Sequence, residues 1–349
     1  MRLFARTLIA GLMATALPQG MAGATDPAPA AARATTALLD YARAQNSTAL
    51  LVMRDGRILV DERWAPPEGD RQFQLFVYGR TADGALLEDV ASQQKSFVAM
   101  LVAIGIDKRL IDIDKPVSAY LGTGWSKATR DQEAKIRVVD VLTMSSGLNE
   151  AFGYTAPPGT TFFYNTPVYA VTKRIVTAAA KQPLEAVTRD WLTGPLGMTD
   201  TAWRKRPPAL ASVGNDTGLV TTPRDTATFG RMVLHGGVAD DGRRVVSTAQ
   251  MKALFTRSAT NPAYGRLWWL NGSGYTMRAL TGRRPGPLVA AAPADMVAAL
   301  GAFDRRLYVV PSLKLVVVRT GAAATDKDFD QQFWLRLIAA LPTLSETRS

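Results

Sequence analysis

Apolar runs broken by short polar segments predict two β-hairpins, one towards each end of the chain. In the first, β-prone runs at residues 48–53 and 57–61 flank the polar sequence Arg54-Asp55-Gly56. In the second, apolar runs at 307–310 and 315–318 flank a short segment that begins with Pro311. A turn of this kind between two such runs is typical of antiparallel strands that are neighbours in a sheet.

Helical patterns lie outside and between the hairpins. Residues 97–104 are apolar on every face of a helix, which predicts a helix buried in the core. Phe329, Phe333 and Leu337 would share one helix face and predict a C-terminal helix. A further helix is expected at 35–44, and residues 118–208 carry helical patterns broken by glycine and proline.

The order of these elements predicts an α+β fold. A hairpin, a helical stretch, further hairpins and a final helix give an antiparallel sheet flanked by helices, with an inserted all-α subdomain. We expect one domain at 35–342, with its α/β part at about 35–96 and 218–342 and its helical part at about 97–217. A tail would follow at 343–349.

The N-terminus has the pattern of a bacterial secretory signal at residues 1–24. Arg2 and Arg6 precede an apolar run at 8–17, and Ala22-Gly23-Ala24 resembles a cleavage site. The apolar run is short for a bilayer span, which leaves a membrane anchor as the weaker alternative. The Ala- and Pro-rich residues 25–34 predict a disordered lead-in. We therefore expect a periplasmic or secreted protein, cleaved near Ala24, without stable membrane insertion.

The composition excludes several kinds of chemistry. The 349 residues include no cysteine and one histidine, which excludes disulfides, thiol nucleophiles, iron–sulfur clusters and two-histidine zinc motifs. The formal net charge is +11, but the basic residues form no stripe interleaved with aromatic residues, so nucleic acid is not an expected partner. No metal or other cofactor is expected. The lone His235 stands at an expected helix end, and the chain lacks the Gly-x-Ser-x-Gly elbow of a histidine-based triad.

The candidate catalytic pair is Ser92 and Lys95, in the one Ser-x-x-Lys sequence of the chain. On a helix, residues three apart share a face, so the Lys95 amine can reach the Ser92 hydroxyl. Apolar surroundings lower the pKa of a lysine, and its neutral amine can then act as a base. The same two residues could instead be a helix cap and a solvated lysine, and the local pattern does not decide between these interpretations.

Several segments, taken in order, resemble the serine β-lactamase and penicillin-binding protein superfamily. The similarity is greatest to its class C-like branch, which includes esterases, D-aminopeptidases and amide hydrolases. The matching segments are 89–97 around Ser92, 110–121, 142–148 and 218–225, and the resemblance extends over about residues 35–341. It implies the β-lactamase/transpeptidase-like fold and makes Ser92 the nucleophile and Lys95 its base.

The resemblance also identifies two departures from the family pattern. Tyr164-Asn165-Thr166 stands at the place of the Tyr-x-Asn motif. This implies that Tyr164 is a second general base, with a phenolate favoured by Lys95, and that Thr166 contacts substrate in place of the amide. The alternative for Tyr164 is a core aromatic. Ala299-Leu300-Gly301 stands where the family has Lys-Thr-Gly, so the cation and hydroxyl that help bind a substrate carboxylate are missing.

Leu300 and Gly301 remain candidates for substrate binding, and the backbone N–H groups of Ser92 and Ala302 are the expected oxyanion hole. These residues imply a serine hydrolase that forms an acyl-enzyme on Ser92 and cleaves a small-molecule ester, amide or peptide. The missing Lys-Thr pair argues against efficient hydrolysis of β-lactams and of D-Ala-D-Ala ends. The alternative is a non-catalytic module, similar to a penicillin-binding protein, that binds cell-wall peptide or a protein partner. Trp268 and Trp269 could wall the cleft or pack in the core, and the sequence leaves the oligomeric state open.

Overall fold

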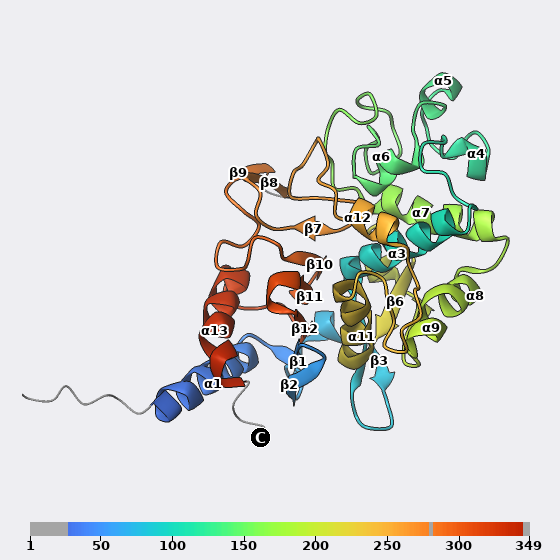
Figure 1. The fold of residues 1–349 in the computed structure, drawn as a ribbon. Helices are drawn as coiled ribbons and strands as arrows, with labels where there is room; N and C mark the ends of the chain where they lie inside the picture. The colour runs from blue at the N-terminus through green and yellow to red at the C-terminus, as the bar shows by residue number, and fades with distance from the viewer. Residues whose placement is uncertain (1–26, 279–281, 345–349) are drawn as a thin grey trace, which may run out of the picture.

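A computed structural model describes residues 27–278 and 282–344 of the protein (Figure 1). Its main sheet is antiparallel throughout, in the order β2-β1-β12-β11-β10-β7. The sheet therefore places the first hairpin directly beside the last one. Its strands are β1 (Ser47–Arg54), β2 (Arg57–Arg63), β7 (Trp269–Leu270), β10 (Val297–Gly301), β11 (Arg305–Val310) and β12 (Leu315–Gly321).

Both predicted hairpins are confirmed. Strands β1 and β2 pair as neighbours, with Arg54 opposite Arg57, and β11 and β12 pair in the same way, with Val310 opposite Leu315. In the first turn Asp55 and Gly56 have φ angles of 50° and 77°. This left-handed pair is the conformation that a two-residue hairpin needs to match the twist of its strands.

Helices cover both faces of this sheet. Helices α1 (Pro27–Ala44) and α13 (Phe329–Leu344) pack together on one face, and α11 (Pro223–Leu234) packs on the other (Figure 1). The predicted apolar face of α13 is confirmed, because Phe329, Phe333 and Leu337 are all buried. The predicted central helix is α3 (Gln94–Asp107), and residues 97–104 are buried along its whole circumference.

The start of α1 corrects the expected N-terminal boundary. The helix begins at Pro27, so most of the segment 25–34 is helical, where a disordered lead-in was expected. The segment is rich in alanine, the residue with the highest helix propensity, and proline is tolerated in the first turn of a helix. The expected signal sequence at 1–24 and the end of the expected tail lie outside the described residues.

The middle of the chain is rich in short helices, as expected, but it also contributes to a second sheet. That sheet has the order β3-β4-β6-β5 and includes β5 within the stretch that was expected to be helical. Its strands are β3 (Val77–Arg80), β4 (Leu86–Asp89), β5 (Ala202–Lys205) and β6 (Thr217–Thr221), and a two-stranded ribbon is formed by β8 (Tyr275–Arg278) and β9 (Gly282–Pro285). The remaining helices are α2 (Arg71–Gln74), η1 (Ala91–Gln93), α4 (Ser118–Leu121), α5 (Arg130–Glu133), α6 (Val138–Leu142), α7 (Thr166–Ala180), α8 (Leu184–Thr188), η2 (Arg189–Thr193), α9 (Gly194–Leu196), α10 (Pro208–Ala211), α12 (Thr248–Leu254) and η3 (Pro311–Leu313).

No helix among the described residues combines the length and the apolar composition that a bilayer crossing requires.

Candidate active site

Ser92 lies at the turn between β4 and the buried helix α3. It belongs to the short helix η1, which leads directly into α3. The preceding residue, Ala91, has a φ of 52°, in the left-handed region that residues with a side chain rarely adopt. The Ala91 N–H donates to Asp89 Oδ1 at 2.8 Å, which holds this turn closed. The strained turn thus presents Ser92 at the N-terminal end of a rigid helix.

A buried ion pair anchors this turn. Asp89 is fully buried and accepts two hydrogen bonds from Arg206, with Nε at 2.7 Å and a terminal nitrogen at 2.8 Å. A Cβ atom on Gly218 would lie only 1.9 Å from Asp89 Oδ2, so glycine makes room for the pair. The sequence did not predict this ion pair, since Asp89 and Arg206 are 117 residues apart in the chain.

Lys95 is buried and faces Ser92. Its Nζ lies 3.0 Å from Ser92 Oγ and 3.3 Å from Thr166 Oγ1, and only 2% of the residue is exposed. Burial lowers the pKa of Lys95 well below its usual value, and the charges of Arg206 and Lys173 lower it further. The neutral amine is therefore favoured, and the interpretation of Lys95 as a solvated first-turn residue is wrong.

Tyr164 also belongs to this cluster, but its hydroxyl stays protonated. Its ring stacks on Trp269 with centroids 5.8 Å apart, and the Lys95 Nζ lies 4.9 Å from its centroid. Burial raises the pKa of Tyr164 to about 12, opposed by a hydrogen bond with Ser92. The expectation of a favoured phenolate is therefore wrong, because desolvation dominates and Lys95 itself is driven towards its neutral form.

Of the two tryptophans that could wall the cleft or pack in the core, Trp268 packs in the core. It is fully buried against Phe229 and Phe255.

The two residues after Tyr164 have different roles: Asn165 stabilises the start of a helix, and Thr166 faces the candidate active site. Asn165 is buried and caps α7: its Oδ1 accepts from the Val168 N–H at 3.1 Å, and its Nδ2 donates to the Leu148 carbonyl at 2.8 Å. Thr166 begins the helix and directs its hydroxyl towards Lys95. The amide is thus used for structure, while the threonine contacts the candidate base.

A cavity of about 310 Å³ opens beside this cluster. Ser92, Lys95, Thr166 and Ala302 all line it, which brings together most of the residues that the sequence singled out. Leu300 and Gly301 are not among its lining residues; Ala302 and Phe303, just beyond the end of β10, take that place. The N–H groups proposed for the oxyanion hole therefore belong to two residues that share one cavity.

Gly301 has a different role at the site, because it lets β10 approach the segment before Ser92. A Cβ atom at this position would lie 2.4 Å from the Val90 carbonyl oxygen, a distance that real structures do not tolerate. We expect Gly301→Ala to displace Ala302 from Ser92 and to lower kcat by about 10²-fold. Steady-state kinetics of the folded variant would measure this. Gly274→Ala is the matched control, since nothing lies within 4 Å of its added Cβ. Equal activity of the two variants would contradict the close-approach argument.

A second buried lysine, Lys173, lies near the site and was not anticipated. It is on α7, where its Nζ donates to Asn215 Oδ1 at 2.5 Å and to the Thr217 carbonyl at 2.7 Å. The Tyr169 ring is shared by both lysines: its centroid is 4.7 Å from Lys95 Nζ and 5.8 Å from Lys173 Nζ. Burial, with the charge of Arg206, lowers the pKa of Lys173 to about 7.

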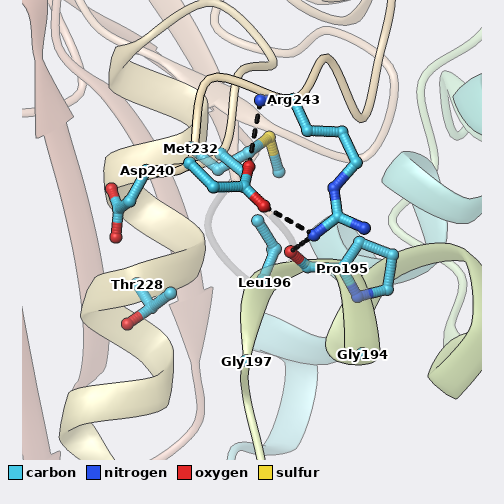
Figure 2. Close-up of a pocket in the computed structure, with 10 residues that line it drawn as sticks. Gly194, Pro195, Leu196, Gly197, Thr228, Met232, Asp240 and Arg243 are labelled. Atoms are coloured by element: carbon cyan, nitrogen blue, oxygen red, sulfur yellow. Dashed lines mark hydrogen bonds and ion pairs between the residues drawn. The ribbon is translucent and has the colours of Figure 1, made fainter.

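Another cavity, of about 280 Å³, lies between α9, α11 and the segment 239–243 (Figure 2). It shares no lining residue with the cavity beside Ser92. The Arg243 side chain in this cavity is hydrogen-bonded to Asp241 at 2.8 Å and to the Pro195 carbonyl at 2.9 Å. Figure 2 shows the contact of Arg243 with Pro195. Its lining holds no nucleophile paired with a base. Within the described residues, no group of three histidine or carboxylate side chains could hold a metal ion.

His235 follows the last residue of α11 and is exposed, which confirms its expected place at a helix end. It is not among the residues that line the cavity beside Ser92. We therefore expect His235→Ala to leave kcat/KM unchanged within experimental error. Ester hydrolysis by the purified variant would measure this. A large loss of activity would indicate that His235 takes part in catalysis.

Comparisons with known proteins identify the family of this chain and structures with a similar fold. A family model described as Beta-lactamase matches residues 11–341. Among solved structures, a class C β-lactamase mutant superposes with a TM-score of 0.66 at 15% identity, covering 89% of this chain and 98% of that one. A β-lactamase from Mycobacterium bovis gives 0.63 at 17%, covering 90% and 98%, and a β-lactamase/D-alanine carboxypeptidase from Yersinia pestis gives 0.61 at 17%, covering 89% and 99%. No relative was found among curated proteins.

The fold is that of the serine β-lactamase and penicillin-binding protein superfamily. The chain belongs to the β-lactamase family.

Proposed function

We propose that this protein is a serine hydrolase that forms an acyl-enzyme on Ser92 and cleaves a small-molecule ester, amide or peptide. The observation that carries the proposal is the contact of 3.0 Å between the Nζ of the buried Lys95 and the Oγ of the partly buried Ser92. A lysine that is desolvated in this way can accept a proton from an adjacent hydroxyl, which is the arrangement of an activated nucleophile. A binding module without catalysis has no need for a buried lysine whose amine contacts a serine hydroxyl.

In the proposed acylation step, the neutral Lys95 amine takes the proton of Ser92, and Ser92 Oγ forms a bond to the substrate carbonyl. The resulting oxyanion accepts hydrogen bonds from the N–H groups of Ser92 and Ala302. When the bond to the leaving group breaks, the protonated Tyr164 hydroxyl supplies its proton, and the Lys95 ammonium restores that proton to Tyr164. Water then attacks the acyl-enzyme carbonyl and gives a proton to Lys95. The bond to Ser92 Oγ breaks, Lys95 returns that proton to Ser92 Oγ, and the acid is released.

The sequence at the third motif bears on which substrates this site takes. The names of the class C β-lactamase and the D-alanine carboxypeptidase refer to substrates that carry a carboxylate beside the scissile amide. Ala299 is fully buried on β10 and Leu300 follows it, in place of a lysine and a hydroxyl. We therefore propose that β-lactams and D-Ala-D-Ala ends are poor substrates. The N-terminal pattern supports action in the periplasm or outside the cell.

The test compares the mature protein with its Ser92→Ala variant on a panel of 4-nitrophenyl esters and on nitrocefin. We expect ester turnover in the parent protein, loss of that turnover in the variant, and little hydrolysis of nitrocefin. Intact-mass analysis after treatment with a fluorophosphonate should find one adduct, on Ser92. Absence of both turnover and adduct would overturn the hydrolase proposal, and turnover that survives in Ser92→Ala would overturn the choice of nucleophile.

A further inference from the structure

We infer that the cavity beside Ser92 receives an uncharged, apolar acyl group, so that the substrates are esters or amides of neutral carboxylic acids. This inference rests on the proposed function and names its substrate class. Three observations carry it: the apolar side chains that line the cavity, the engagement of its charged groups within the protein, and its volume.

Apolar side chains from three separate parts of the chain line the cavity. Phe76 comes from the segment before β3, Leu210 and Val213 from α10 and the turn after it, and Phe303 from the turn after β10. Val213 is 52% exposed although it is a large hydrophobic residue, and it is one of few such residues in the described part of the chain. An apolar acyl chain in the cavity would cover this surface, which gains free energy in proportion to the area removed from water.

The charged side chains that line the cavity are not available to a substrate carboxylate. They are Lys95 and Arg206. The Arg206 guanidinium is bonded through two nitrogens to Asp89 and through the third to the Asn215 carbonyl, and Asp89 cancels its charge. Lys95 contacts Ser92 and Thr166, and burial favours its neutral form. Two amide side chains, Gln72 and Asn215, also line the cavity, but neither carries a charge. A carboxylate in this cavity would therefore give up part of its hydration without gaining a counter-ion, which is unfavourable.

The volume limits the size of the acyl group. At about 310 Å³ the cavity is at the lower end of the range of about 300–1,000 Å³ that is usual for small-molecule sites. A short or medium aliphatic chain or a single ring fits this volume, whereas a long fatty acyl chain would have to extend into solvent. Rates should therefore rise from acetyl to hexanoyl esters and fall again at palmitoyl esters.

The decisive comparison uses two substrates of similar length, 4-nitrophenyl pentanoate and mono-4-nitrophenyl glutarate, which differ in a terminal carboxylate. We expect kcat/KM for the neutral ester to be higher by at least about tenfold, from the cost of a buried carboxylate without a partner. The neutral methyl ester of the glutarate compound should recover most of the difference, which separates charge from bulk. Equal rates, or a preference for the glutarate, would overturn the inference.

A variant with a new cation tests whether the cavity itself sets this preference. Val213→Arg places a guanidinium at the cavity wall, at a site exposed enough to leave folding intact. It should reduce the preference for the neutral ester by at least about tenfold, the low end of what a charge-assisted hydrogen bond contributes. Leu335→Arg is the matched control, since Leu335 is 50% exposed on α13, outside the cavity, and carries the same charge change. If both variants reduced the preference for the neutral ester equally, net charge would explain the change and the inference would be overturned.

The failure of this inference can be told apart from the failure of the proposed function. If Ser92 is acylated but the glutarate ester is preferred, the hydrolase stands and the substrate class is wrong. If no ester is turned over, binding can be measured directly in Ser92→Ala: its Tm should rise with pentanamide and remain unchanged with glutarate monoamide. The absence of a rise with pentanamide would overturn the inference on its own terms.

Discussion

Lys95→Met is expected to lower kcat/KM by about 10²- to 10⁴-fold, the usual contribution of a positioned general base. Methionine fills nearly the same volume but cannot accept the Ser92 proton across the 3.0 Å contact. Folding should be preserved, since the substitution removes a buried amine that has no carboxylate partner. Near-parental thermal unfolding together with loss of ester hydrolysis would support the assignment. Lys108→Met, on an exposed residue that follows the same helix, is the control and should keep full activity.

The same assignment fixes the direction of the pH dependence. Lys95 must be neutral to act as a base, so kcat/KM for an uncharged ester should rise as pH increases through the lowered pKa of Lys95. The rise should come at a pH well below that at which an ordinary lysine loses its proton. A rise only in the range of a solvated lysine would contradict the assignment, and so would an unchanged profile in Lys95→Met.

Asp89→Asn is expected to lower the free energy of unfolding by about 3–5 kcal/mol, which is typical when one partner of a buried ion pair is removed. Asparagine keeps the shape of the side chain but leaves the Arg206 charge uncompensated in the interior. Urea unfolding would measure the loss. A further change of Arg206 to methionine should recover part of it, because no buried charge then remains.

The control for this second prediction is Asp61→Asn. Asp61 forms an ion pair with Arg224 at 2.6 Å, but Arg224 is largely exposed. Exposed pairs of this kind contribute about 0–1 kcal/mol. If Asp89→Asn were no more destabilising than Asp61→Asn, the pair with Arg206 would not be a structural anchor of the Ser92 turn.

Local patterns were sufficient for the elements that depend on short stretches of sequence. The polar turn at Asp55 and Gly56 predicts the first hairpin, and the uniformly apolar residues 97–104 predict a buried helix. The second sheet was missed because β5 has four residues and one of them is buried, which leaves no alternation to detect. Short strands of this kind are stabilised by their neighbours more than by their own sequence.

In the candidate site, too, contacts between residues close in sequence could be predicted, and contacts between distant segments could not. Ser92 and Lys95 are three residues apart, so helical spacing allowed their contact, and the resemblance to the superfamily favoured it over a solvated lysine. Arg206 is 117 residues from Asp89 and Asn215 is 42 residues from Lys173, so only the folded chain brings these partners together. The protonation of Tyr164 could not be read from the sequence either, because it depends on how completely the surrounding rings exclude water.

The second buried lysine has a consequence for the pH range in which the site works. Lys173 lies against the same Tyr169 ring as Lys95, and its charge contributes to lowering the pKa of Lys95. Lys173→Met would remove that charge, so the pKa of Lys95 should rise. The increase of kcat/KM with pH should then occur at higher pH than in the parent protein. The acid side of the activity profile is thus set in part by a residue that does not contact the nucleophile.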